Sequence, residues 1–172
     1  EGSQDQNLTA GQHQGVFVAV ENNTLKAHTD SKIEMNIYNY NLPRDSVKLR
    51  IWGNDVRGLN TQGTGINIYS GSNPLRAVIG NNEINNTYYG IVFSSEQSSR
   101  AKVLNNSIDS TQYYGIMLNR VSGKLEANTV TYAGRYSHFG VQLESDFNYP
   151  ANDTLIGNTI TENGQWAYSN PT

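Results

Sequence analysis

The chain has 172 residues, of which 36% are hydrophobic, and its formal net charge is −3 at pH 7. The length suits one domain, but the low apolar fraction excludes a thick globular core and favours a single unit with a thin interior. Only 12 Lys and Arg residues are present, which predicts no basic stripe and therefore no nucleic-acid partner, and no apolar run is long enough to predict membrane insertion.

The elements expected along the chain form one pattern that returns almost to the C-terminus. Residues 1–14 are polar and are expected to be a loose entry segment. A β-branched strand is predicted at residues 16–20, followed by a turn at Asn22 and Asn23 and an alternating strand at residues 33–37. The same order of strand, Asn turn, short strand, variable turn and Gly-led strand returns four more times before a degenerate last repeat.

An Asn with an apolar residue three positions before it and another two positions after it marks each repeat. These residues are Asn23, Asn54, Asn82, Asn106, Asn128 and Asn158. They recur about every 22 to 31 residues, a period typical of solenoids. Three short strands per repeat predict an all-β fold, a right-handed single-stranded parallel β-helix of about six coils. We expect one domain over residues 1–172, as a fragment of a longer solenoid, because neither end has a cap.

The Asn turn has a physical rationale. Asn tolerates the left-handed backbone conformation that a tight bend needs, and its side-chain amide can bond to the equivalent Asn of the next coil. We therefore expect the six Asn residues to make the bend and to stack as an internal ladder, with Asn106 buried between Asn82 and Asn128.

The order of elements over residues 16–168 resembles that of the pectate-lyase-like superfamily of right-handed parallel β-helices. This order is a strand, an Asn bend, a short strand, a turn and a Gly-Ile-x-Leu strand. That superfamily includes polysaccharide lyases, galacturonases, mannuronan epimerases and phage tailspikes, so the resemblance implies the fold more than the function. It also implies that the outer face of the Gly-led strands binds uronate chains or lipopolysaccharides. The catalytic motifs of the lyases, galacturonases and epimerases are absent, so the resemblance assigns no catalytic residue.

Alternation along the Gly-led strands predicts which side chains line that outer face. Aromatic rings and amides there suit a sugar chain, which offers apolar faces to stack and hydroxyls to hydrogen-bond. The candidate substrate-binding residues are Tyr69, Tyr88, Tyr113, Asn119 and Gln142. A second aromatic column, Tyr89, Tyr114 and Phe139, is expected to point inward and to stack in the core.

The candidate catalytic residues are expected in or beside loops, where the repeat is loosest. Glu144 and Asp146 are two carboxylates that suit the acid and base of a hydrolase, and Arg120 or His138 suits proton abstraction by a lyase. Glu96 and Arg100 are also expected in loops, and solvated loop charges are the alternative interpretation. With no Cys and three scattered His residues, the sequence predicts no metal site, and no cofactor is expected.

Two functions remain open at this point. The first is a carbohydrate-active β-helix, secreted or on a phage particle, that binds and cleaves or epimerises an acidic extracellular polysaccharide. The alternative is a non-catalytic stalk, adhesin or assembly module. In both cases the uncapped coil ends predict covering by the rest of a parent chain or by a homotrimer.

Overall fold

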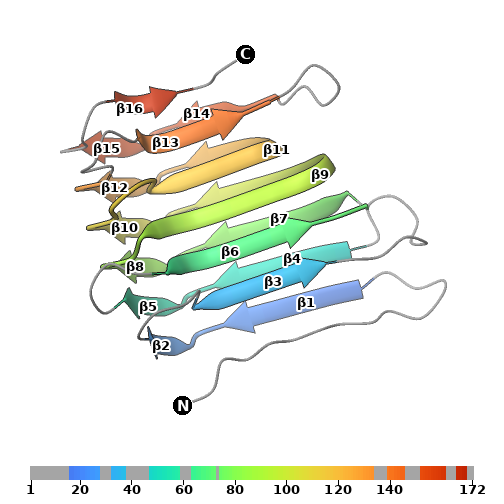
Figure 1. Cartoon of the computed structure of the whole chain (residues 1–172), viewed down its shortest axis with the longest axis horizontal. Coiled ribbons are helices and arrows are strands. Elements are labelled where there is room, and N and C mark those ends of the chain that lie inside the picture. Colours follow the sequence, from blue (N-terminus) through green and yellow to red (C-terminus); the bar gives the residue numbers. More distant parts are fainter. Residues whose placement is uncertain are drawn as a thin grey trace.

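The computed structural model describes residues 16–27, 32–37, 47–58, 63–72, 74–133, 139–145 and 152–161, together with the backbone of residues 166–169. Every regular element in these residues is a β-strand, and the strands stack from β1 at one end to β16 at the other (Figure 1). Neighbouring strands pair in parallel throughout the stack, for example β1 with β4 and β10 with β12. The chain is therefore a parallel β-helix of about six coils, as the repeat predicts.

Each coil contains the three expected kinds of strand. The strands before the Asn bend are β1 (Val16–Glu21), β4 (Val47–Trp52), β7 (Leu75–Gly80) and β14 (Thr154–Ile156). The short strands after the bend are β2 (Thr24–Ala27), β5 (Asp55–Gly58), β8 (Glu83–Asn85), β10 (Ser107–Asp109), β12 (Thr129–Thr131) and β15 (Thr159–Thr161). The Gly-led strands or their equivalents are β3 (Ile33–Ile37), β6 (Thr64–Ser70), β13 (Phe139–Glu144) and β16 (Trp166–Ser169).

Two long strands, β9 (Tyr89–Leu104) and β11 (Ile116–Glu126), differ from the prediction. Each runs from a Gly-led strand directly into the first strand of the next coil, where a loop was expected. The first half of β9 pairs with β6 and its second half with β7, so the strand belongs to both long faces. Glu96, Arg100 and Arg120 therefore lie in strands, which corrects their assignment to loops.

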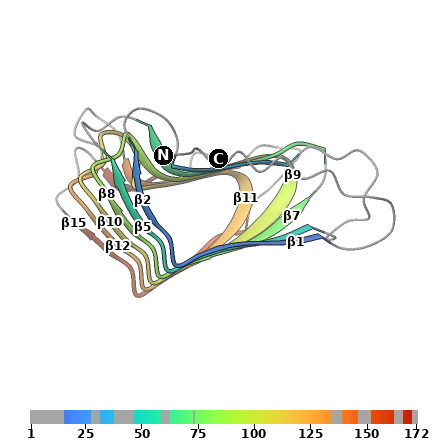
Figure 2. The same cartoon turned by 90° about the horizontal axis from the view of Figure 1, so that it is seen from below.

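The strands form two parallel sheets that meet at the Asn bend. The ten-stranded sheet includes both long faces because β9 and β11 curve from one face to the other (Figure 2). The six-stranded sheet, in the order β15-β12-β10-β8-β5-β2, forms the short side beyond the bend. Strands of one kind lie directly above one another, so equivalent residues of successive coils form columns.

Inward-pointing apolar side chains fill the space between the sheets. The short strands contribute Val56, Ile84, Ile108 and Val130, all with 0% exposure. Each such side chain contributes about 1.5–3 kcal/mol relative to remaining in water.

The backbone of adjacent coils comes so close at the start of a Gly-led strand that only Gly fits there. A Cβ on Gly90 would lie 2.3 Å from the carbonyl oxygen of Gly115.

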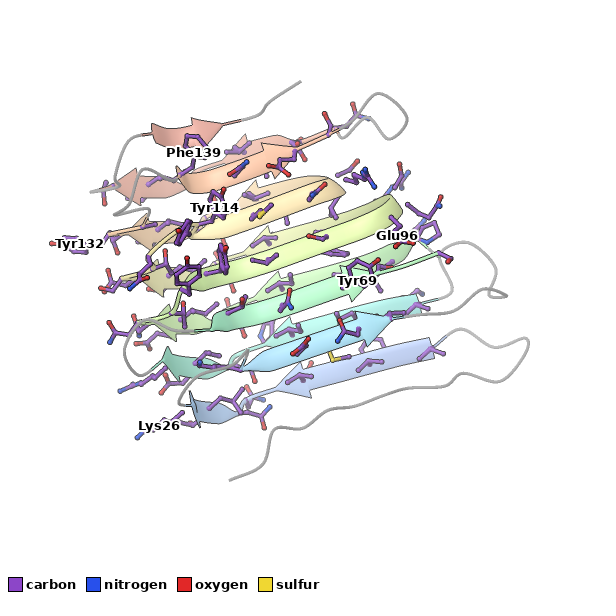
Figure 3. The ribbon with its side chains drawn as sticks, in the orientation of Figure 1. Lys26, Tyr69, Glu96, Tyr114, Tyr132 and Phe139 are labelled. Carbon is purple, nitrogen blue, oxygen red and sulfur yellow. The ribbon has the colours of Figure 1, made fainter. Side chains whose placement is uncertain are left out.

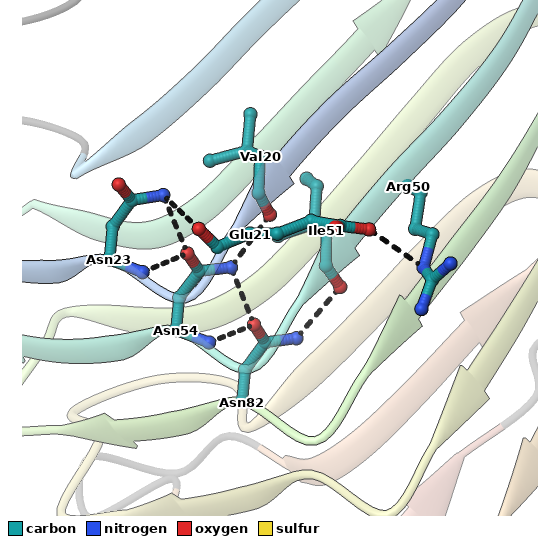
Figure 4. Close-up of polar contacts among 7 residues, drawn as sticks. All are labelled: Val20, Glu21, Asn23, Arg50, Ile51, Asn54 and Asn82. Carbon is teal, nitrogen blue, oxygen red and sulfur yellow. Dashed lines mark hydrogen bonds and ion pairs between the residues drawn. The ribbon is translucent and has the colours of Figure 1, made fainter.

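The six Asn residues stack into the expected ladder, and each rung is bonded to the next in the same way. Figure 4 shows the rungs Asn23, Asn54 and Asn82. Asn54 donates from Nδ2 and from its backbone N–H to Oδ1 of Asn82, at 2.9 and 3.0 Å. Its second amide proton goes to the carbonyl oxygen of Val20 at 3.0 Å. Asn106 has 1% exposure and repeats these contacts between Asn82 and Asn128. The ladder thus satisfies polar groups that would be costly to bury unpaired.

The left-handed residue of each bend precedes the ladder Asn, which corrects the prediction that the ladder Asn itself supplies this conformation. The residues with positive φ at this position are Asn22, Gly53, Asn81, Asn105, Ala127 and Gly157, with φ between 53° and 68°. None of the non-Gly residues with positive φ in the described part of the chain is a ladder Asn. The bend thus uses two residues, one that turns the backbone and one whose amide joins the coils.

Candidate functional site

The outward side chains of the Gly-led strands form a face that we call the outer band. Strand register places them in two columns: Glu34, Asn67, Val92, Met117 and Gln142 in one, and Asn36, Tyr69, Ser94, Asn119 and Glu144 in the other. The predicted alternation is correct along these strands. Most members are partly exposed, but Gln142 is only 7% exposed and offers little surface to a ligand.

Tyrosines gather at one edge of the outer band. The rings of Tyr88 and Tyr113, both half-buried, have centroids 4.3 Å apart. Their hydrogen bond is the main cause that raises the pKa of Tyr88 to about 12, with burial and the neighbouring phenols adding to it. Tyr69 lies elsewhere on the band and donates a hydrogen bond from its hydroxyl to Glu96 (Figure 3). The predicted ligand-binding tyrosines therefore do not form one platform.

The second aromatic column stacks as expected but is not part of the sealed core. Tyr89 and Tyr114 have ring centroids 5.8 Å apart and an interplanar angle of 19°, and Tyr114 and Phe139 are 6.3 Å apart at the same angle. All three rings are half-buried, because they stand at the start of the Gly-led strands where the coil opens. Burial, followed by the charge of Glu144, raises the pKa of Tyr114.

The candidate catalytic cluster is only partly within the described structure. Glu144 pairs in register with Asn119, which places Arg120 on the neighbouring strand. Glu144 accepts a hydrogen bond from Gln142, and Arg120 is half-buried at a β-bulge with φ 56°. Asp146 and His138 lie outside the described residues. The structure brings Glu144 and Arg120 into neighbouring coils and leaves the four-residue site a prediction.

A basic groove, which the composition did not predict, lies on the other long face. We call it the cationic trough. It has a volume of about 660 Å³ and is lined by outward and backbone groups of β1, β4, β7, β9, β11 and the segment at β14. Half of the chain's 12 Lys and Arg residues line it, namely Lys48, Arg50, Arg76, Arg100, Lys102 and Lys124, and no described Asp or Glu does.

Strand register explains how few charges make a basic stripe. Lys48, Arg76 and Arg100 lie directly opposite one another on β4, β7 and β9. Each of these residues stands six positions before the ladder Asn of its coil. A second row stands four positions before the ladder Asn and contains Arg50, Val78, Lys102 and Lys124. Counting back from each Asn would have revealed both rows. Alternation along the Gly-led strands alone does not reveal the trough.

The fold and its columns define the class: this is a protein with the pectate-lyase-like parallel β-helix fold. Residues 3–170 match the family described as "Periplasmic copper-binding protein (NosD)", and the chain belongs to that family. No curated protein and no solved structure matches the chain. The family is described as periplasmic. This supports the expected location outside the cytoplasm, but it supports neither secretion nor a phage particle. None of the described elements is a helix long and apolar enough to cross a membrane.

The family description raises the question of a copper site, and the described residues do not fit one. They contain no group of three or more His, Cys, Asp or Glu side chains placed to hold a metal ion. The sequence has no Cys, and Met35, one of its two Met residues, is sealed in the core with 3% exposure. Thiolate, thioether and imidazole groups are the ligands that copper prefers. We therefore derive no copper chemistry for this chain, whose three His residues all lie outside the described ranges.

Proposed function

We propose that the chain is a non-catalytic binding and assembly module that works outside the cytoplasm. The family description supports this role, because it names a binding protein of the periplasm and no enzyme. The observation that carries the proposal is the bonding in the outer band. Glu144, a carboxylate of the band, accepts a hydrogen bond from Gln142, and Glu96, two residues beyond the band on β9, accepts one from Tyr69.

These bonds matter because acid–base catalysis needs a carboxyl group aimed at the substrate. In the outer band, the carboxylates contribute instead to a surface of interlocked side chains. The Asn ladder at the bend of each coil fixes successive coils in one register, so the surface is presented without rearrangement. Such a preformed face suits binding, because little conformational entropy is lost when a partner docks.

The test is a search for turnover. The purified chain is incubated with alginate, pectate and capsular polysaccharides, and unsaturated uronates and new reducing ends are measured over time. We expect no product from any of them. Product formation that disappears in Glu144→Gln would contradict the non-catalytic role.

A second candidate function is action on an acidic polysaccharide at the outer band, with Glu144, Asp146, Arg120 and His138 as its catalytic residues. The Tyr88 and Tyr113 pair favours it, because partly exposed aromatic rings at the edge of a polar band suit sugar rings. On this hypothesis, Tyr113→Ala weakens retention on immobilised pectate while Lys26→Ala, on the short side of the coil, leaves it unchanged. Equal retention of both variants would remove the support that the tyrosines give.

A further inference from the structure

We infer that the cationic trough binds an extended, acidic segment of a partner polypeptide. The inference rests on the proposed assembly function for the kind of partner, and it assigns the site that recognises it. Nothing in the family description refers to this face of the coil.

The shape of the trough fits one extended chain. Its walls are two rows of outward side chains separated by one inward residue, so their Cα atoms are roughly 7 Å apart. Its floor is the strand backbone at Leu49, Ala77, Ala101 and Gly123. Six strands about 4.8 Å apart give a length of roughly 24 Å, the reach of about seven extended residues. A strand or loop of a partner can lie along this line, whereas a helix of about 10 Å diameter is too wide to enter.

The like charges of the trough repel one another in the free protein. Like charges directly opposite one another on adjacent strands are destabilising, yet Lys48, Arg76 and Arg100 occupy one column. Within the described residues, no carboxylate lies within ion-pair distance of Lys48, Arg100 or Lys102. An anionic chain along the trough would relieve this repulsion.

Two other cations of the trough are already held in position. Arg50 pairs with Glu21 at 2.9 Å and lies over the Trp52 ring, 5.0 Å from its centroid. Lys124 pairs with Glu126 at 2.6 Å. Glu21 and Glu126 each stand two residues before the ladder Asn of their coil, at the next outward position beyond the trough. These pairs therefore orient Arg50 and Lys124 along the wall of the trough. The cations without a carboxylate partner among the described residues, Lys48, Arg100 and Lys102, lie on β4 and β9.

The lining favours a polypeptide over other polyanions. The guanidinium group of Arg100, which has no carboxylate partner among the described residues, can bind a carboxylate with two parallel hydrogen bonds. Phe17, which is 64% exposed, ends one row of cations and Val78 interrupts the other, so both add apolar surface. A segment that mixes Asp or Glu with apolar side chains matches both features.

Rival polyanions match the trough less well. Single-stranded nucleic acid binds through stacking platforms, and Phe17 is the one aromatic ring among the described lining residues. A uronate chain needs hydrogen-bond partners for its hydroxyls along its length. The described neutral polar side chains, Ser122, Asn152 and Thr154, all lie at one end of the trough.

The test measures fluorescence polarisation of a labelled peptide of about eight alternating Glu and Val residues. The comparison variants are Arg100→Gln with Lys102→Gln in the trough and Lys26→Gln with Arg57→Gln outside it. Each pair removes one Arg and one Lys. We expect about five- to tenfold weaker binding for the trough pair and less than about a twofold change for the control pair. A Gln and Val peptide should not bind.

Charge reversal makes the test independent of folding defects. Arg100→Glu with Lys102→Glu should lose the Glu and Val peptide and gain binding to a Lys and Val peptide. Three results would overturn the inference. The first is equal weakening in the trough and control pairs, and the second is absence of binding by the unaltered chain. The third is tighter binding, per anionic group, of polygalacturonate or an oligonucleotide. Reducing ends are measured in the polygalacturonate samples, because their release would refute the non-catalytic function while leaving the peptide result to stand or fail separately.

Discussion

The asparagine ladder and the cationic trough are both columns in which similar side chains repeat from coil to coil, yet the repetition has opposite consequences. In the ladder, each amide donates to the next and accepts from the one before, so identical neighbours stabilise one another. In the trough, Lys48, Arg76 and Arg100 carry one sign of charge and repel. A parallel β-helix thus uses self-complementary side chains inside to hold its register and leaves unfavourable columns outside for binding.

The largest expected effect comes from breaking an inner rung. Asn106→Leu removes the amide that donates to Asn128 and to the carbonyl oxygen of Ile79, and that accepts from Asn82. Several buried polar groups then lose a partner, at about 1–3 kcal/mol each. We expect the free energy of unfolding in urea to fall by about 3–5 kcal/mol.

Asn23→Ala is the matched control for that prediction. Asn23 is exposed at the first rung, where it donates to Asn54 and accepts from no described residue. Its removal should cost about 1 kcal/mol. Equal losses for the two variants would show that the ladder does not act through its buried hydrogen bonds.

A steric test of the same stacking has the next largest effect. Gly90→Ala places a methyl group 2.3 Å from the carbonyl oxygen of Gly115 and 2.7 Å from a methyl carbon of Ile108. Overpacking of this kind costs about 1–3 kcal/mol. Thermal unfolding should detect the loss, whereas Ser94→Ala on the outer band should leave the midpoint nearly unchanged.

The tyrosine edge gives a prediction in pH. Because the raised pKa of Tyr88 favours its protonated form in the fold, its contribution to stability is complete below pH 10 and is lost as pH rises through about 12. Tyr113→Phe removes the main cause of the shift. Ultraviolet titration of tyrosinate should then place Tyr88 closer to its ordinary pKa, and an unchanged titration curve would contradict the assigned hydrogen bond.

The smallest effect is expected in the trough and has the opposite sign. Arg100→Gln removes one repulsive charge from the column, so it should stabilise the free protein by about 0.2–1 kcal/mol at low salt. The gain should vanish at about 1 M salt, where charges are screened within about 3 Å. A loss of stability in low-salt urea unfolding would show that Arg100 has a structural partner.

The ladder could be predicted from the sequence because one residue type does one task in every coil. Asn106 is recognisable from its spacing to Asn82 and Asn128 alone. The left-handed residue was assigned incorrectly because Asn22, Gly53 and Ala127 all fill that position, and no single residue type marks it.

The trough was harder to predict because its columns vary in residue type. The row of Lys48, Arg76 and Arg100 continues into Phe17 at one end and Ser122 at the other. Its basic character exists only once strand register brings distant cations together, and the net charge of −3 conceals it. The polar residues where β9 and β11 bend, such as Ser95 and Asn119, also suit turns, so loops were expected where strands continue. Of the proposed catalytic residues, Glu144 and Arg120 could be placed in neighbouring coils from the repeat, but their bonding partners could not.

The most direct test of the account compares the two faces in one binding measurement. Polarisation of the labelled Glu and Val peptide is measured with Arg100→Gln and Lys102→Gln in the trough, and with Tyr113→Ala and Glu144→Gln in the outer band. We expect about five- to tenfold weaker binding for the trough pair and unchanged binding for the outer-band pair. Weaker binding for the outer-band pair, with none for the trough pair, would contradict it.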